Sequence, residues 1–122
     1  MNMILVVEDN PNQQFLIEEE LHDAGYRVVC ASSGHKAVQM VRDECPDCVV
    51  LDINMPDMDG LEIFKEILQI DPQMPVIVNT AYAVYPSNFL NWAADAYVVK
   101  SGDLAELKER ITEVLARGKT SG

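Results

Sequence analysis

The chain has 122 residues, 48% of them hydrophobic, which fits one globular domain with a single core. Its formal net charge of −11 argues against direct binding to nucleic acid or to an anionic membrane, because both repel a negative surface. No apolar stretch approaches the ~20 residues of a membrane helix. The N-terminus lacks a basic signal-peptide region, so we expect a cytoplasmic protein.

Apolar runs alternate with helical patterns along the chain. The first run, MILVV, predicts a strand at about 3–7. A helix should follow from Pro11, with Asn10 as its N-cap and Gln13 completing a capping box. Gly25 is the residue type expected just beyond the end of this helix.

The middle of the chain repeats this pattern. A strand at about 26–31 leads to a helix at about 34–44, and helical spacing places Cys45 on the inward face of that helix. A third strand is predicted at about 48–52, and another helix near Gly60. Each strand is thus followed by a helix.

The C-terminal half continues the alternation. Strands are predicted at about 76–79 and 96–99, separated by a helix that begins near Pro86. The last helix should begin after Asp103, a suitable N-cap. Residues 118–122 are interpreted as a flexible tail.

Strands that alternate with helices predict an α/β fold, in which a parallel sheet carries helices on both faces. The continuous apolar runs fit this prediction, because strands of such a sheet are buried on both sides. We therefore expect a flavodoxin-like, doubly wound, five-stranded sheet with the strand order 2-1-3-4-5. Ligands bind such sheets outside the C-terminal strand ends where the winding reverses, between the first and third strands.

Side chains suited to phosphoryl chemistry follow the strands at this edge. The first strand is followed by Glu8 and Asp9, the third by Asp52, the fourth by Thr80 and the fifth by Lys100. Three neighbouring carboxylates repel one another, and a hard divalent cation such as Mg²⁺ relieves the repulsion. A carboxylate can also accept a phosphoryl group, and cationic and hydroxyl groups can offset the charge of that group. The pattern indicates a site for metal and phosphoryl binding.

Four segments of the sequence carry a resemblance to a known family. They are VVEDN at 6–10, LDINMPDMDG at 51–60, PVIVNTA at 75–81 and DAYVVK at 95–100. With these segments the chain resembles the receiver domain of bacterial two-component response regulators. The resemblance extends along the whole chain and implies one receiver domain at 1–117, followed by the tail.

The resemblance also implies roles for the acidic residues. Asp52 is then the phosphoacceptor, and Asp9 binds Mg²⁺ directly, with Mn²⁺ as a possible substitute. Asp52 and the carbonyl of Asn54 would be further metal ligands, and Glu8 would help through water.

The remaining residues that match the family pattern concern contacts with the phosphoryl group and the conformational change that follows phosphorylation. By the same resemblance, Thr80 and Lys100 contact the phosphoryl oxygens, as does the backbone at Asn54 and Ala81. Tyr97 is the aromatic switch that turns inward when Thr80 moves. The donor is a phosphohistidine on a sensor histidine kinase or a histidine phosphotransfer protein. The domain promotes its own phosphorylation and dephosphorylation and controls a downstream protein or output domain, as a monomer or a phosphorylation-dependent dimer.

The chain departs from the usual family pattern after the fourth and fifth strands. Lys100 is followed by Ser101 where the family usually has proline, which makes a cis bond there costly, at about 2.5–4 kcal/mol. Tyr82 is bulky for its position two residues after Thr80, and Pro86 lies near the expected fourth helix. We expect Tyr82 to border the phosphoryl site and slow hydrolysis.

Three other functions are weighed against this one. An aspartyl-phosphate phosphatase resembles DxDxT, but Asn54 stands where the second carboxylate would be needed, two residues after Asp52. A flavodoxin-like cofactor site would need a phosphate-binding loop, and EDNPNQ at 8–13 is acidic instead. A redox pair would use Cys45 and Cys48, but an apolar run begins at Cys48, which is expected to be buried.

Overall fold

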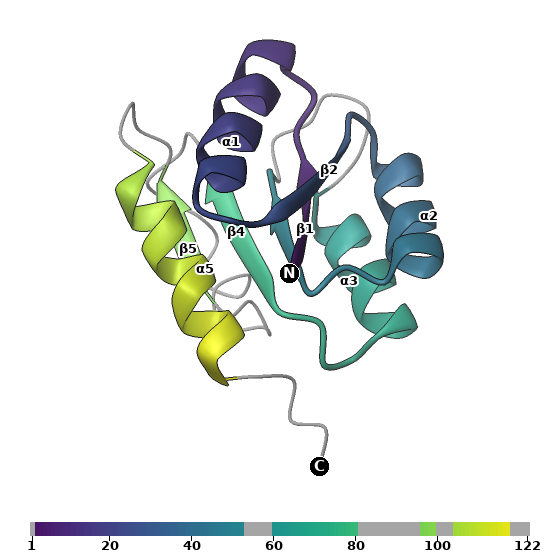
Figure 1. The fold of residues 1–122 in the computed structure, drawn as a ribbon. Helices are drawn as coiled ribbons and strands as arrows, with labels where there is room; N and C mark the ends of the chain where they lie inside the picture. Colours follow the sequence, from purple (N-terminus) through teal and green to yellow (C-terminus); the bar gives the residue numbers. More distant parts are fainter. Residues whose placement is uncertain (1, 53–59, 81–95, 100–103, 118–122) are drawn as a thin grey trace.

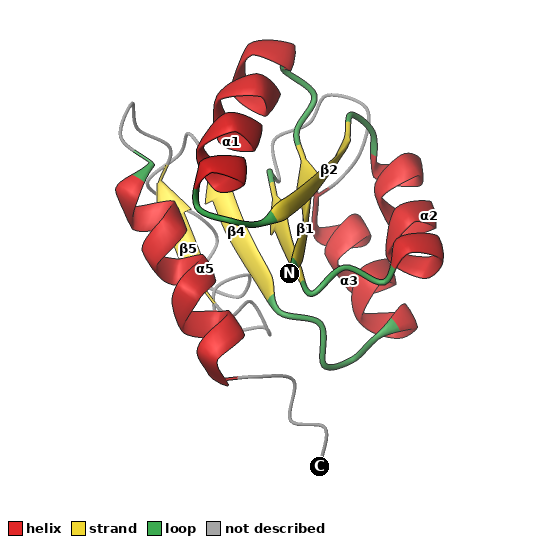
Figure 2. Ribbon diagram, in the orientation of Figure 1, coloured by secondary structure: helices red, strands yellow, loops and turns green. Residues whose placement is uncertain are grey.

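The computed structural model describes residues 2–52, 60–80, 96–99 and 104–117. Five parallel strands form one sheet in the order β2-β1-β3-β4-β5, which confirms the predicted fold (Figure 1, Figure 2). The strands are β1 (Met3–Val7), β2 (Arg27–Ala31), β3 (Cys48–Leu51), β4 (Val76–Thr80) and β5 (Ala96–Val99). The helices are α1 (Pro11–Asp23), α2 (Gly34–Glu44), α3 (Gly60–Ile70) and α5 (Ala105–Arg117).

Three features of the predicted fold lie outside the described residues. They are the helix near Pro86, the N-cap at Asp103 and the tail at 118–122. Among the helices that the structure does describe, none is both long and apolar enough to cross a membrane.

The strands β1, β3 and β4 are buried on both faces, as their continuous apolar runs predicted. In β1, Leu5 and Val7 contribute to a core with α2 and α3, whereas Ile4 and Val6 contribute to a second core with α1 and α5 (Figure 1). Alternate side chains of a strand point to opposite faces, so a run such as MILVV supplies both cores at once. Within the described residues, the helices thus cover both faces of the central strands.

The start of α1 is fixed by Asn10, with Pro11 at the first helical position. The Asn10 side-chain oxygen accepts from the N–H groups of Asn12 at 2.9 Å and Gln13 at 3.2 Å, which confirms the predicted N-cap. The predicted capping box is wrong in its second half. The N–H of Asn10 donates to the carboxylate of Glu8 at 3.2 Å, so it is not available to the side chain of Gln13.

The end of α1 is fixed by Gly25, as predicted. Its φ of 98° lies in the left-handed region that suits glycine. The N–H of Gly25 donates to the carbonyl of His22 at 3.0 Å, and the N–H of Tyr26 donates to that of Leu21 at 3.1 Å. This pair of bonds is a Schellman motif, which satisfies the last carbonyls of the helix and turns the chain into β2.

Helix α2 has Ser33 as its N-cap and Cys45 as its C-cap. The prediction that Cys45 faces inward is wrong, because this residue is exposed. Its φ of 50° is left-handed, so the chain leaves the helical path there and the helical spacing no longer sets its direction. Cys48 is fully buried in β3, as predicted from the apolar run that it begins.

Candidate metal and phosphoryl site

The ends of β1 and β3 lie side by side in the sheet. Val7 and Leu51 are register partners, so the next residues, Glu8 and Asp52, leave neighbouring strands at the same level. The N–H of Asp52 donates to the carbonyl of Val7 at 3.1 Å, and the N–H of Glu8 donates to that of Ala31 at 3.0 Å. The sheet hydrogen bonding thus continues one residue beyond the strands and fixes the backbone under both carboxylates.

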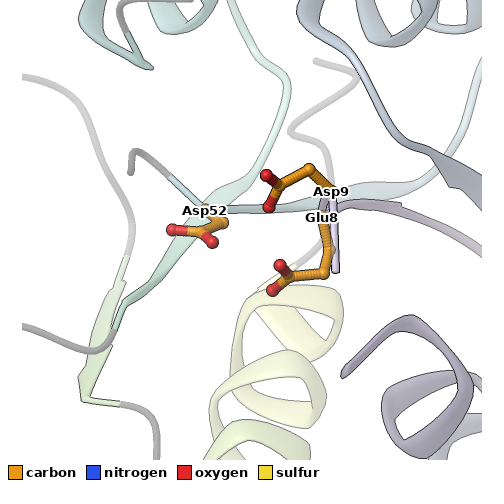
Figure 3. Close-up of side chains that lie close together, drawn as sticks. All are labelled: Glu8, Asp9 and Asp52. Atoms are coloured by element: carbon orange, nitrogen blue, oxygen red, sulfur yellow. The ribbon is translucent and has the colours of Figure 1, made fainter. Parts of the chain in front are cut away.

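The structure brings Glu8, Asp9 and Asp52 together at this edge. Each offers one carboxylate oxygen, and these oxygens all lie within 4.8 Å of one another. Figure 3 shows the carboxylates of Glu8 and Asp9 on the side of the β1 end that faces Asp52. Glu8 is 2% and Asp52 is 5% exposed, whereas Asp9 is partly open to solvent. Two buried carboxyl groups and a third beside them thus form an acidic cluster at this edge of the sheet.

The cluster fits a hard divalent cation. All three donors are carboxylate oxygens, which Mg²⁺ prefers over nitrogen or sulfur. With bonds of about 2.1 Å, two oxygens on opposite sides of Mg²⁺ lie about 4.2 Å apart. Three ligands of one octahedral ion include at most one such opposite pair, so these oxygens, all within 4.8 Å of one another, would move closer together on binding the ion. Within the described residues, Asp9 is partly exposed, so the cluster is in contact with solvent on that side.

The turn between β1 and α1 holds Glu8 at its carboxylate and at its backbone. The N–H of Asn10 donates to Glu8 Oε2 at 3.2 Å, and Gln14 Nε2 donates to the carbonyl oxygen of Glu8. Sequence reasoning missed Gln14, which reads as an ordinary polar residue of a helix. The sequence contains one indication of this role: Gln14 lies one helical turn after the N-cap Asn10. A long side chain at that position can reach back toward the end of the strand.

The other predicted site residues are described only in part. Thr80 is the last residue of β4 and the register partner of Val99, so its backbone lies at the strand ends beyond β3. Tyr97 is the register partner of Val78 in the middle of the same pair. Outside the described residues lie Asn54, Ala81, Tyr82, Lys100 and Ser101.

Two solved structures share the fold of this chain. The chain is similar to the response regulator protein TrrA from Thermotoga maritima, whose crystal structure contains Mg²⁺–BeF. The two are 42% identical with a TM-score of 0.88, over 93% of this chain and 99% of TrrA. In a second structure, of the histidine kinase ThkA in complex with TrrA, the match is 43% identical with a TM-score of 0.86, over 94% of this chain and 99% of the matched one.

Sequence comparison agrees with these structures. The transcriptional regulatory protein ZraR of Klebsiella oxytoca is 36% identical over 120 residues, which are 97% of this chain. The chain spans only 27% of the length of that relative. A family model described as the response regulator receiver domain matches residues 4–112. Because this match covers nearly the whole sheet and its acidic edge, the chain belongs to the response regulator receiver domain family.

Proposed function

We propose that this receiver domain accepts a phosphoryl group on Asp52 in a Mg²⁺-dependent reaction. The observation that carries the proposal is the carboxylate cluster, in which oxygens of Glu8, Asp9 and Asp52 lie within 4.8 Å of one another. A buried carboxylate beside two others is unfavourable in a purely structural role, because like charges repel and burial removes their hydration. A site that binds a cation and a phosphoryl group uses this arrangement.

The transfer needs only one nucleophile from the receiver. A carboxylate oxygen of Asp52 attacks the phosphorus of a phosphohistidine, and the new O–P bond forms as the N–P bond breaks. The imidazole keeps the electron pair of the broken bond and takes up a proton. Attack by water on the acyl phosphate later releases inorganic phosphate and restores the carboxylate. The domain would thus promote its own phosphorylation and dephosphorylation without turning over an external substrate.

Asp9 and Asp52 would hold the Mg²⁺ directly, together with the carbonyl of Asn54, and Glu8 would act through a bound water. Bound Mg²⁺ supplies the positive charge that offsets the carboxylates and the phosphoryl oxygens. Mn²⁺ accepts the same oxygen donors and would substitute. The Mg²⁺–BeF complex of TrrA, at 42% identity, supports this part of the proposal.

The response to phosphorylation would pass through β4 and β5. Thr80 and Lys100 would contact the phosphoryl oxygens, with the backbone of Ala81 beside them, and Tyr97 would change position when Thr80 moves. The pairing of Thr80 with Val99 supports this assignment, because Thr80 lies beside the last residue of β5 and Lys100 is the next residue in the sequence. Such a change would alter the surface that a downstream protein or output domain contacts.

The donor would be a sensor histidine kinase or a histidine phosphotransfer protein. The structure of TrrA with the kinase ThkA supports a kinase as partner. A surface feature of this chain also supports it. Phe15 is 60% and Leu16 52% exposed on α1, the helix that begins two residues after Asp9. Adjacent large apolar side chains exposed on a surface are typical of protein contacts, and a donor must bring its histidine to the edge of the sheet from which α1 starts.

Intact mass spectrometry with a small phosphoryl donor, such as acetyl phosphate, tests the phosphoacceptor. With Mg²⁺, the parent protein should gain the mass of one phosphoryl group, and Asp52→Asn should gain none. Asp23→Asn, an exposed aspartate at the far end of α1, is the matched control and should label like the parent. Full labelling of Asp52→Asn would show that another residue accepts the phosphoryl group.

A further inference from the structure

A ring of three hydrogen bonds closes the turn between β1 and α1. The N–H of Asn10 donates to Glu8 Oε2 at 3.2 Å, and the N–H of Gln14 donates to the carbonyl of Asn10 at 2.9 Å. The side-chain amide of Gln14 then donates to the carbonyl of Glu8. The ring joins the carboxylate of one candidate metal-site residue to the backbone that leads to the next, Asp9.

We propose that Gln14 is a positioning residue for the metal site, which sets the place of the Asp9 carboxylate through the peptide between Glu8 and Asp9. The carbonyl of Glu8 and the N–H of Asp9 belong to this one planar unit. A hydrogen bond to the carbonyl therefore limits rotation of the whole unit, and the Cα and side chain of Asp9 follow it. The inference rests on the proposed Mg²⁺ binding.

The repulsion among the three carboxylates explains why a restraint on Asp9 would favour metal binding. Asp9 is the most exposed of the three acids, so it is the one that repulsion from Glu8 and Asp52 can push outward into water. A turn that already holds Asp9 near the others lowers the ordering cost of binding a cation. Gln14 does this without adding charge. A glutamate of the same shape would place an acceptor against the carbonyl and add a fourth acid.

The neighbouring Gln13 offers a matched control. It is also partly buried in the first turns of α1, and its backbone N–H bonds to Asn10. Within the described part of the chain, its side chain makes no hydrogen bond, unlike the side chain of Gln14. Replacing either glutamine with methionine removes an amide from the same helix while keeping side-chain length and helix propensity. Only the Gln14 change breaks the ring.

An NMR titration with MgCl₂ tests the inference on the unphosphorylated chain. We expect Gln14→Met to weaken Mg²⁺ binding on the order of tenfold, as for other residues that support metal ligands. Gln13→Met should stay within about twofold of the parent. Amide hydrogen exchange without metal gives an independent readout, because Asp9 and Asn10 should exchange faster in Gln14→Met only. Gln14→Asn, whose amide is too short to reach, should repeat the result and guards against misfolding of the methionine variant.

The outcomes separate this inference from the proposed function. Mg²⁺ binding by the parent with equal affinity in Gln14→Met overturns the positioning role alone. Equal weakening in both methionine variants also overturns it, because the effect would then belong to the helix in general. A parent that binds no Mg²⁺ overturns the proposed function together with this inference.

Discussion

The turns that follow β1 and β2 perform the same structural task with different residues. Each joins a parallel strand to a helix, and each supplies a side-chain oxygen as an N-cap. Asn10 accepts from two backbone N–H groups, and Ser33 accepts from the N–H of Lys36 at 3.2 Å. The first turn also carries Glu8 and Asp9, whereas the second consists of two serines.

The second turn shows that a strand-to-helix connection in this fold requires an N-cap residue but no acidic residue. A connection built from serines leaves no charge near the core, whereas the first turn buries Glu8 to 2% exposure at a cost in hydration. The acids of the first turn are therefore explained by the site and not by the fold. Variants in the two turns should separate the contribution of the site from that of the fold. Only variants in the first turn should change metal binding and phosphoryl transfer.

Removing Asp9 should have the largest effect on the response to metal. At a Mg²⁺ concentration ~100 times Kd, binding stabilises a native protein by about 2.7 kcal/mol, and Asp9→Ala should lose most of this rise in melting temperature. Without metal, the variant should melt at or above the parent temperature, because one repelling charge is gone. Asp23→Ala, exposed at the end of α1, is the control. An unchanged Mg²⁺ response in Asp9→Ala would exclude its role as a direct ligand.

The apolar pair on α1 should matter only to a protein donor. Phe15→Ala should slow phosphoryl transfer from the cognate kinase about tenfold, the equivalent of ~1.4 kcal/mol. Labelling by acetyl phosphate should not change, since that donor needs no docking surface. Lys36→Ala is the matched control, because it alters an exposed residue in the first turn of α2. Equal slowing by both variants, or slowing with acetyl phosphate, would contradict docking at α1.

Loss of either cap should cost similar stability but differ in its effect on the site. Asn10→Ala and Ser33→Ala should each lower the free energy of unfolding by about 1 kcal/mol, measured by urea denaturation. Asn10→Ala should also weaken Mg²⁺ binding, because the freed turn carries Glu8 and Asp9. Ser33→Ala should leave the Mg²⁺ affinity unchanged. If both variants bound Mg²⁺ as the parent does, the cap would have no part in the site.

Much of this structure follows from local patterns, and the misses have physical causes. Continuous apolar runs predicted the strands to within about one residue, because burial on both faces leaves no other pattern. Cys45 was misplaced because helical spacing was extended into a left-handed residue. The bonds from Asn10 and Gln14 to Glu8 were missed because they depend on how the turn folds back over the strand end, which periodicity does not contain.

The smallest predicted effect concerns Cys30, in β2 just before the uncharged turn. Burial, and then the carboxylate of Glu18, raises the pKa of the Cys30 thiol from its ordinary 9.0 to about 11. Below pH 9 the thiol keeps its proton in both the folded and unfolded chain, so it has no effect on stability. Between pH 9 and 11 the unfolded chain loses this proton first, so stability should fall as pH rises.

Comparing Cys30→Ala with the parent separates the effect of this thiol from that of the other groups that titrate at high pH. We expect the stability of the parent to fall more steeply above pH 9, by less than about 1 kcal/mol, because the thiol is only half-buried and solvent screens it. Urea denaturation at several pH values measures the difference. Equal slopes would mean that the end of β2 tolerates a negative charge. The ends of β1 and β2 would then differ in which residues they carry, and not in how well their surroundings tolerate a negative charge.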